Sequence, residues 1–372
     1  MPRLGDVVDL LHAWFPPATA DSWDAVGLVS GDPDAEVRKV MFAVDPTLEV
    51  AREAVEWGAD LLVVHHPLFL TPVHGFAATT PKGRTLHTLA AAGCALLTAH
   101  TNADQALGGV SEAMAAALGL TDVEPLLPAP HEPLDKLTVY VPAAVGDAIR
   151  AAMAGAGAGR LGDYARASFS TAGQGRFRPL AGAAPTIGEV GRFEVVDEER
   201  IEAVLPRALR AAVVAAMLAV HPYEVPAYDV MELCDPGTGE TGTGRIGSTE
   251  PTALRAFAER VAAALPVTAH GVRVAGDPDR VVRRVALCGG AGDFLLDTVR
   301  VTDADVYVTS DLRHHRAGEF VEHGGPALVD VAHWAAEWTW LPVVSARVAD
   351  ALGATVETRV STINTDPWHF RI

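Results

Sequence analysis

The sequence contains few cysteines and no long apolar segment. Three of its 372 residues are cysteine, Cys94, Cys234 and Cys288, and no two of them form a CxxC pair. This excludes a disulfide framework and a zinc site built from thiolates, and it favours a reducing compartment. No run of about eighteen uncharged apolar residues occurs, and the first residues lack a signal-peptide pattern. We therefore expect a cytoplasmic protein with no membrane partner.

Basic residues are also scarce. The sequence has 29 Lys and Arg against 47 Asp and Glu, a formal net charge of −18. Proteins that bind a phosphate backbone need clustered positive charge, and here it is scattered, which argues against nucleic acid as a partner. Net charge does not exclude a small anionic substrate or effector at a local site. With 49% apolar and 20% charged residues, the chain is expected to form two or three folded domains.

Strands and helices alternate in the first segment, residues 1–130. Apolar runs predict strands, and amphipathic stretches between them predict helices. The predicted strands are 39–47, 60–67 and the beginning of 94–104, and the predicted helices are 48–59 and 83–93. This alternation indicates βαβ units and a parallel sheet.

The same pattern returns in the last segment, residues 240–372. Strands are predicted within 281–293, 303–315 and 325–338, the last continuing into a helix. Asp45 to Asp60 and Gly290 to Asp305 both span fifteen positions. We interpret the two segments as an internal duplication, two related α/β halves of one domain.

The middle segment, residues 135–234, has a different pattern. Strands are predicted at 136–142 and 226–233, a helix at 143–158, a hairpin at 190–206, and a helix from Pro206 to about Val220. Glycine-rich loops are expected at 154–163 and 234–244. The order β-α-β-β-α-β predicts a ferredoxin-like α+β domain inserted between the halves.

Polar groups follow four predicted strands. They are His65 with His66, His100 through Asp104, Asp311 through His315, and His333 with Glu337. Ligands of open parallel sheets bind beyond the carboxyl ends of the strands, so these groups are expected to gather at one site.

The residue types and spacings at these ends suit a metal ion. His333 and Glu337 are four positions apart and share one face of a helix. His65 and His66 are adjacent, and on a regular strand they would point to opposite faces. Pro67 ends the strand, so either a distorted strand end aims both rings inward or each histidine serves its own ion.

Two glycine motifs are candidates for ligand-binding loops. The GTGRIG segment (242–247) matches GxGxxG, but no strand precedes it and no acidic residue closes a following strand, so it does not indicate a dinucleotide site. The CGGAGD segment (288–293) follows a strand, and it either brings backbone N–H groups to a ligand or forms a tight turn.

Ordered motifs along nearly the whole chain make it resemble the GTP cyclohydrolase I type 2 family, also called the NIF-three-like dinuclear metal proteins. These motifs are WDAVGL (23–28), VVHHPLF (63–69), AHTNAD (99–104), GTGRIG (242–247), DVYVTSDLRHH (305–315) and DVAHWAAE (330–337). HPYE (221–224) is typical of longer members with a middle insert similar to PII and CutA. The resemblance implies a ring-shaped homo-hexamer, a trimer of dimers.

The resemblance also implies a two-metal site, formed by His65, His66, Asp104, His333 and Glu337, with Glu337 as a bridge. Mixed nitrogen and oxygen ligands suit Zn, Fe, Mn or Ni.

We therefore expect a metal-dependent hydrolase that acts on a nucleotide-like or phosphate-containing substrate. His100 and His315 are candidate proton shuttles or supports of the ligands. The alternative is a non-enzymatic metal-binding regulator or scaffold whose middle domain senses an effector or binds a partner. A third interpretation, metal storage or delivery, fits five convergent ligands less well.

Overall fold

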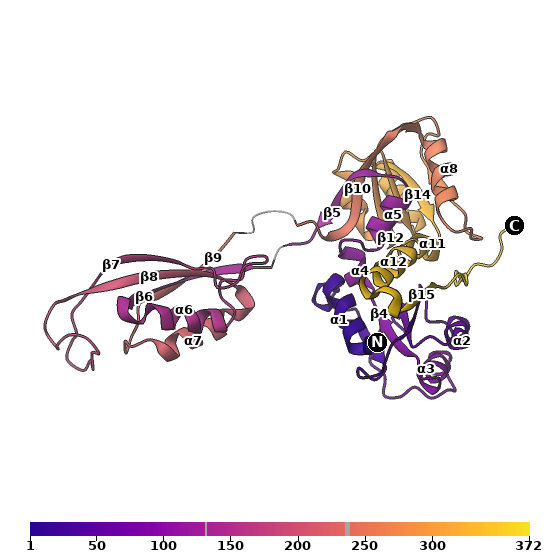
Figure 1. Ribbon diagram of the computed structural model, residues 1–372. Helices are drawn as coiled ribbons and strands as arrows, with labels where there is room; N and C mark the ends of the chain where they lie inside the picture. Colours follow the sequence, from indigo (N-terminus) through magenta and orange to yellow (C-terminus); the bar gives the residue numbers. More distant parts are fainter. Residues whose placement is uncertain (131, 235–238) are drawn as a thin grey trace. The chain divides into compact units, whose positions relative to one another are not determined.

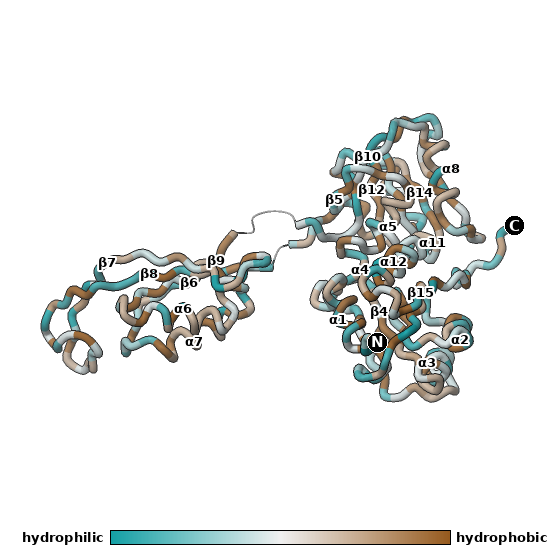
Figure 2. Tube along the Cα trace, viewed as in Figure 1, coloured by the Kyte–Doolittle hydropathy of each residue, from teal (hydrophilic) through white to brown (hydrophobic). Residues whose placement is uncertain are grey.

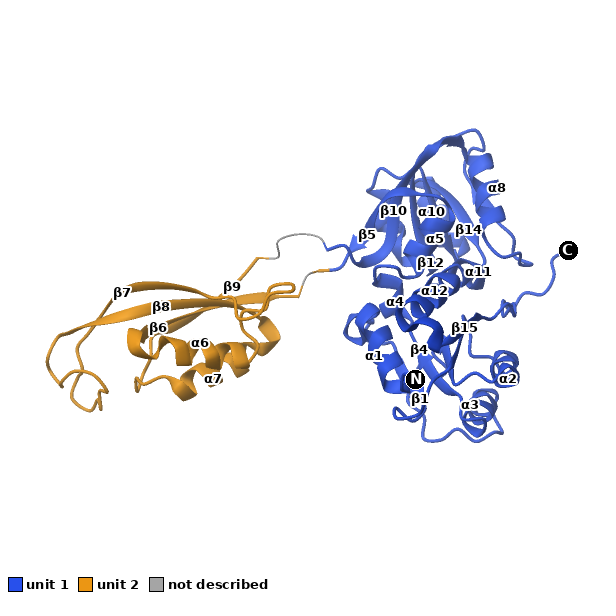
Figure 3. Ribbon diagram, viewed as in Figure 1, with its two compact units in different colours: residues 1–129, 239–372 blue, residues 130–238 orange. Residues whose placement is uncertain are grey.

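The computed structural model describes residues 1–130, 132–234 and 239–372, which fall into two compact units. Unit 1 comprises residues 1–129 and 239–372, and unit 2 comprises residues 130–238 (Figure 3). Among the described residues, no helix is long and apolar enough to cross a membrane. The predicted loop at 234–244 falls partly outside the described residues.

The first sheet of unit 1 has five strands in the order β1-β4-β3-β2-β15. Its strands are β1 (Gly27–Ser30), β2 (Lys39–Ala43), β3 (Leu61–Val64), β4 (Ala95–Thr98) and β15 (Glu357–Val360). All neighbours pair in parallel except β1, which runs antiparallel to β4. The crossovers are α2 (Leu48–Trp57) and α3 (Pro81–Ala91), and α4 (Thr101–Gln105) follows β4.

The second sheet of unit 1 has six strands in the order β11-β14-β13-β12-β10-β5. Its strands are β5 (Thr121–Pro128), β10 (Gly242–Ala253), β11 (Arg273–Ala275), β12 (Val281–Ala291), β13 (Val306–Ser310) and β14 (Ala327–Val331). β12, β13 and β14 pair in parallel, and the other pairs are antiparallel. The GTGRIG segment therefore lies in β10, between two neighbouring strands.

The two sheets repeat one arrangement. Three parallel strands follow each other in chain order, and the strand that precedes them, β1 or β11, pairs antiparallel with the third. The carboxylate of Asp60 accepts hydrogen bonds from the backbone N–H groups of residues 38–39, and the carboxylate of Asp305 accepts the same pair from residues 283–284. These equivalent contacts support the internal duplication.

Alternating side chains of each parallel strand enter different cores. Val40 and Phe42 of β2 face a central core, whereas Met41 and Ala43 pack with α2 and α3. The second sheet also contributes to the central core, together with α1 (Leu4–Trp14), α5 (Val110–Ala117), α8 (Leu254–Ala264), α11 (His333–Trp338) and α12 (Trp340–Leu352). Its other face packs with α9 (Leu296–Arg300) and α10 (His314–Glu322). These buried strands are largely apolar in Figure 2.

Unit 2 has the predicted element order β-α-β-β-α-β. Its elements are β6 (Leu134–Pro142), α6 (Gly146–Gly155), β7 (Phe169–Phe177), β8 (Glu194–Pro206), α7 (Arg210–Val220) and β9 (Tyr228–Glu232). The antiparallel sheet has the order β7-β8-β6-β9, and both helices lie on one face of it (Figure 1). Short 3-10 helices cover Pro17–Thr19, Ala143–Val145, Arg207–Leu209, Asp293–Leu295 and Gly353–Thr355.

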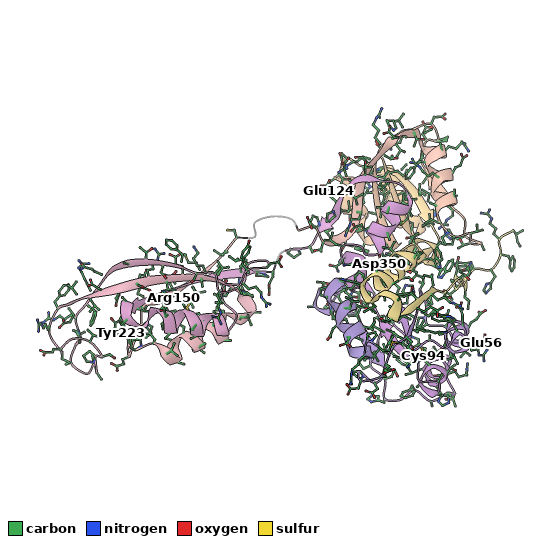
Figure 4. All side chains as sticks on the ribbon, in the orientation of Figure 1. Glu56, Cys94, Glu124, Arg150, Tyr223 and Asp350 are labelled. Carbon is green, nitrogen blue, oxygen red and sulfur yellow. The ribbon has the colours of Figure 1, made fainter. Side chains whose placement is uncertain are left out.

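Two details predicted for unit 2 are wrong. Residues 190–206 do not form a hairpin, because β8 is one long strand that pairs with β7. In the acidic centre of β8, Glu199 accepts a hydrogen bond from Arg150 of α6 at 2.8 Å (Arg150 is labelled in Figure 4). Pro206 ends β8 and does not begin the helix, which starts at Arg210.

Candidate metal centre

Three strand ends of unit 1 deliver the predicted ligands to one place. His65 and His66 directly follow β3, Asp104 lies in α4 after β4, and His333 opens α11 after β14. Asp104 is thus on a short helix. Both halves of the duplication contribute, because α4 and α11 follow the third parallel strand of their respective sheets.

Glu337 lies at the middle of the cluster. Its Oε1 is 2.8 Å from Nε2 of His333 and 3.4 Å from Nε2 of His65. Its Oε2 is 3.1 Å from Nε2 of His66. Asp104 Oδ1 lies 3.7 Å from Nε2 of His65. The structure therefore brings all five predicted ligands together, with one carboxylate touching three imidazoles.

The three histidines are oriented by the ring nitrogen that faces away from Glu337. Each Nδ1 lies beside an oxygen that can only accept a hydrogen bond. These oxygens are the Ala99 carbonyl for His65 (2.9 Å), Asp45 Oδ1 for His66 (2.7 Å) and Asp311 Oδ2 for His333 (2.7 Å). Nδ1 therefore carries a proton, and Nε2 is the nitrogen directed at the cluster, where it can bind a cation in place of a proton. Metal-binding histidines are held in this way.

The cluster contains buried polar atoms that make no hydrogen bond. Among the described residues, Nε2 of His65, Oδ1 of Asp104 and Oε2 of Glu337 are buried and accept or donate no hydrogen bond. Leaving such an atom unsatisfied costs about 1–3 kcal/mol. A divalent cation would be coordinated by all three, and neutral nitrogen with carboxylate oxygen is a suitable donor set for it. The residues present therefore fit a metal centre.

The charges of the cluster are strongly coupled. Burial opposes ionisation of Glu337, but the positive charges of His333, His66 and His65 hold its pKa well below the usual range. The Glu337 carboxylate raises the pKa of His333 to about 11. Burial favours neutral His66, but Glu337 and Asp45 raise its pKa to about 10. Burial raises the pKa of Asp104 to about 6. The site is thus built to hold positive charge beside Glu337.

His100 lies beside the cluster, and His315 does not. The His100 ring is 5.1 Å from the ring of His65 and 5.5 Å from that of His66, and its Nδ1 donates to Asp24 Oδ1 at 2.8 Å. Burial and the neighbouring His65 lower the pKa of His100 to about 4, so it is neutral at pH 7. His315 is exposed in the first turn of α10, where its ring contacts His314. In the described part of the chain, no hydrogen bond or ion pair joins His315 to the cluster.

Among the residues behind the ligands, Asp45 and Asp24 were not predicted as site residues, whereas Asp311 was predicted at the site without this role. Asp45, Asp311 and Asp24 each bind the Nδ1 of one histidine. Asp45 follows β2, Asp311 follows β13, and Asp24 lies in the WDAVGL motif. These positions were the signal in the sequence that they belong to the site. Asp311 adopts a left-handed conformation with φ of 57°.

The glycine motif CGGAGD begins within the end of β12, and its Gly290 lies close to Glu337. Gly290 has a φ of 67°, and a Cβ there would lie 2.6 Å from Oε1 of Glu337. Glycine is therefore required because the backbone of β12 approaches the Glu337 carboxylate closely.

Comparison with known proteins identifies the family of this chain. The family model for Duf34/NIF3 (NGG1p interacting factor 3) matches residues 2–367. The chain belongs to the Duf34/NIF3 family. It is 52% identical over 369 residues to the GTP cyclohydrolase 1 type 2 homolog of Mycobacterium tuberculosis, covering 99% of this chain and 97% of the relative. The homolog of Streptomyces coelicolor is 36% identical, with 99% and 94% covered.

Solved structures show the same fold. A Bacillus cereus protein related to NIF3 is 36% identical and superimposes with a TM-score of 0.75, covering 100% of this chain and 99% of that one. A Staphylococcus aureus protein is 27% identical with a TM-score of 0.83 and the same coverage. The family resemblance drawn from the sequence motifs is confirmed.

Proposed function

We propose that this Duf34/NIF3 member holds two divalent metal ions and acts as a metal-dependent hydrolase on a nucleotide-like or phosphate-containing substrate. The ligands are His65, His66, Asp104, His333 and Glu337. One observation carries the proposal: three imidazoles, each fixed through Nδ1, direct Nε2 at the carboxylate of Glu337. Glu337 would be the ligand shared by both ions, because its two oxygens contact different histidines.

The side chains have separate roles in this proposal. Glu337 and Asp104 provide negative charge, and the histidines provide neutral nitrogen. Divalent ions at such a site supply Lewis acidity and lower the pKa of water. His100 is neutral at pH 7 and is held through Nδ1 by Asp24, so its Nε2 can accept a proton. The Asp24 side chain is fully buried and also accepts hydrogen bonds from the backbone and hydroxyl of Thr101.

A substrate screen tests this function. Metal-replete protein is assayed against nucleotides, cyclic nucleotides and phosphate esters, beside a Glu337→Gln variant and with chelator. We expect turnover that disappears in the variant and in chelator and returns when metal is added back. Equal behaviour of wild type and variant over the whole panel would remove the hydrolase assignment.

A second candidate function is a metal-binding regulator that senses an effector through unit 2. A cavity of about 680 Å³ in this unit favours it, because aromatic and arginine side chains line the wall, including Tyr140, Phe177, Tyr223, Arg176 and Arg200. Tyr223 of the HPYE motif, labelled in Figure 4, donates to Glu198 of β8 at 2.8 Å. We propose that unit 2 is PII- or CutA-like, as the resemblance implies. Effector binding to unit 2 without any turnover would favour the regulator.

Assembly and location are also proposals. The family resemblance implies a homo-hexamer, a trimer of dimers, and the three cysteines without a CxxC pair favour the cytoplasm. Light scattering of the full chain at micromolar concentration is expected to give the mass of six chains, and a monomer would contradict the hexamer.

A further inference from the structure

A cavity of about 410 Å³ in unit 1 adjoins the metal centre. Its walls come from three segments, residues 45–48, 66–68 and 81–85. His66, a proposed metal ligand, and Asp45, its hydrogen-bond partner, both line it. We call this space the Lys82 cavity.

The Lys82 cavity lies where open parallel sheets bind their ligands. Segment 45–48 joins the end of β2 to the start of α2, and segment 66–68 follows the end of β3. Segment 81–85 is the first part of α3. The carboxyl ends of two adjacent parallel strands thus meet the beginnings of two helices. The positive ends of helix dipoles add to the attraction of an anion there.

The basic side chains of this cavity are not engaged with carboxylates. Lys82 is one of three lysines in the sequence, and the other two, Lys39 and Lys136, pair with glutamates at 3.9 and 3.2 Å. Within the described residues, neither Lys82 nor Arg84 lies within 4.0 Å of a carboxylate oxygen, although the chain carries a net charge of −18. Both side chains are exposed.

The acidic residue of the cavity does not neutralise them. Asp45 is the acidic residue among those that line it, and its carboxylate accepts hydrogen bonds from Nδ1 of His66 and from the hydroxyl of Thr365. The Asp45 charge is therefore directed at the metal centre. The positive charges of Lys82 and Arg84 therefore remain available to bind an anion in the cavity.

We propose that the Lys82 cavity is a phosphate-binding subsite, in which Lys82 and Arg84 hold a phosphate group of a substrate that also reaches the metal centre. Arg84 offers a planar fork of N–H donors to phosphate oxygens, and Lys82 offers a point charge. The inference rests on the proposed hydrolase function and deepens it, because it assigns the substrate an anionic group on the α2–α3 side of His66.

Calorimetric titration with inorganic phosphate tests the subsite. The metal-replete full chain is compared with Lys82→Ala, Arg84→Ala and the double variant at low ionic strength. Each single variant should raise the Kd for phosphate about tenfold, and the double variant more, because each removes a charged hydrogen-bond donor. Metal content should stay at the wild-type value, since neither residue touches a ligand.

Arg52→Ala is the matched control, because Arg52 is exposed on α2 and does not line the cavity. It should bind phosphate like wild type. Absence of phosphate binding by wild type, or equal Kd values for wild type and the double variant, would overturn the subsite. The outcome is independent of the hydrolase test: if Glu337→Gln leaves turnover unchanged while the Lys82 variants lose phosphate, the function falls and the subsite stands.

Discussion

Each histidine of the metal centre depends on an acceptor behind its ring. The acceptor fixes which nitrogen carries the proton, and so decides that the other nitrogen faces Glu337. Asp45 has this role for His66, and Asp311 has it for His333. Under the proposed function, residues that contact no metal would therefore control metal affinity.

Removing one of these acceptors should weaken metal binding. In Asp45→Ala, the His66 ring loses its 2.7 Å partner and can rotate or change tautomer. We expect metal affinity to fall about 10–100-fold, measured by competition with a chelator. Asp297→Ala, which alters an exposed carboxylate on α9, should bind metal like wild type. An unchanged affinity in Asp45→Ala would show that Asp45 does not orient His66.

A single methyl group at Gly290 should also disturb the centre. The added Cβ would lie 2.6 Å from Oε1 of Glu337. The backbone φ of 67° at this position is one that residues with a side chain rarely adopt. We expect Gly290→Ala to lower metal occupancy and to cost about 1–3 kcal/mol in the free energy of unfolding.

The matched substitution is Gly318→Ala on α10. Gly318 has ordinary helical backbone and no atom within 4 Å of the added Cβ, so alanine should be neutral or stabilise slightly. Metal occupancy of Gly290→Ala equal to that of Gly318→Ala would contradict the close-approach explanation. Mass spectrometry of bound metal and urea unfolding give the two readouts.

At the scale of elements, the sequence predicts buried structure better than exposed structure. The run LLVV before His65 is apolar throughout because β3 is buried on both faces. The strand was predicted at 60–67, and β3 ends at Val64, three residues before Pro67. The polar segment FSTAGQGRF of β7 has no such pattern, because most of its residues are exposed on both faces. Only pairing with β8 makes it a strand, and pairing cannot be derived from the segment alone.

Contacts between distant segments also limit what the sequence predicts about the metal centre. The ligands stand at strand ends and at helical spacing, so their types and positions predict a cluster. The partners Asp45 and Asp311 come from other strands, and only the fold shows which histidine each one contacts. Gly290 could not be linked to Glu337, because their contact joins residues far apart in the sequence.

One charged contact of unit 2 predicts a pH dependence. Asp135 of β6 is buried, and its carboxylate accepts hydrogen bonds from Arg210 at 2.6 Å and Arg207 at 3.0 Å. The hydrogen bond from Arg210 is the main cause that lowers the pKa of Asp135 below 3.8. A lowered pKa in the folded state stabilises the fold above the unfolded pKa, and this stabilisation is lost as the pH falls through the folded value.

Asp135→Asn should therefore destabilise unit 2 at pH 7, and the difference from wild type should shrink below about pH 4. Hydrogen exchange of β6 amides, compared between variant and wild type at each pH, measures this in the full chain. Asp147→Asn alters an exposed carboxylate on α6 and serves as control. A difference that stays constant down to pH 3 would contradict the assignment.

At the scale of the whole molecule, unit 2 is inserted into unit 1. The two segments of unit 1 that flank the insertion, ending at residue 129 and beginning at residue 239, lie side by side. The backbone N–H of Ala129 donates to the carbonyl of Thr241 at 2.9 Å, and β5 pairs with β10 from Pro128 and Gly242 onward. The site ligands all lie in unit 1. We therefore expect unit 1 to fold and to form its site without unit 2.

Deleting residues 135–234 and joining the flanks should leave metal binding intact. The seven tryptophans, at positions 14, 23, 57, 334, 338, 340 and 368, all belong to unit 1, so their fluorescence reports its folding in the shortened chain. The expected result is native-like fluorescence with the wild-type metal content. A folded deletion variant that binds no metal would show that unit 2 is needed to form the site.

The most direct test of the account is the metal content of the purified full chain, determined by mass spectrometry. Five converging side chains, with three unpartnered buried atoms among them, predict two divalent ions per chain in wild type. Glu337→Ala should lose at least one ion, and His65→Ala/Glu337→Ala should lose both while tryptophan fluorescence stays native-like. Full metal occupancy in that folded double variant would contradict the assignment of the centre.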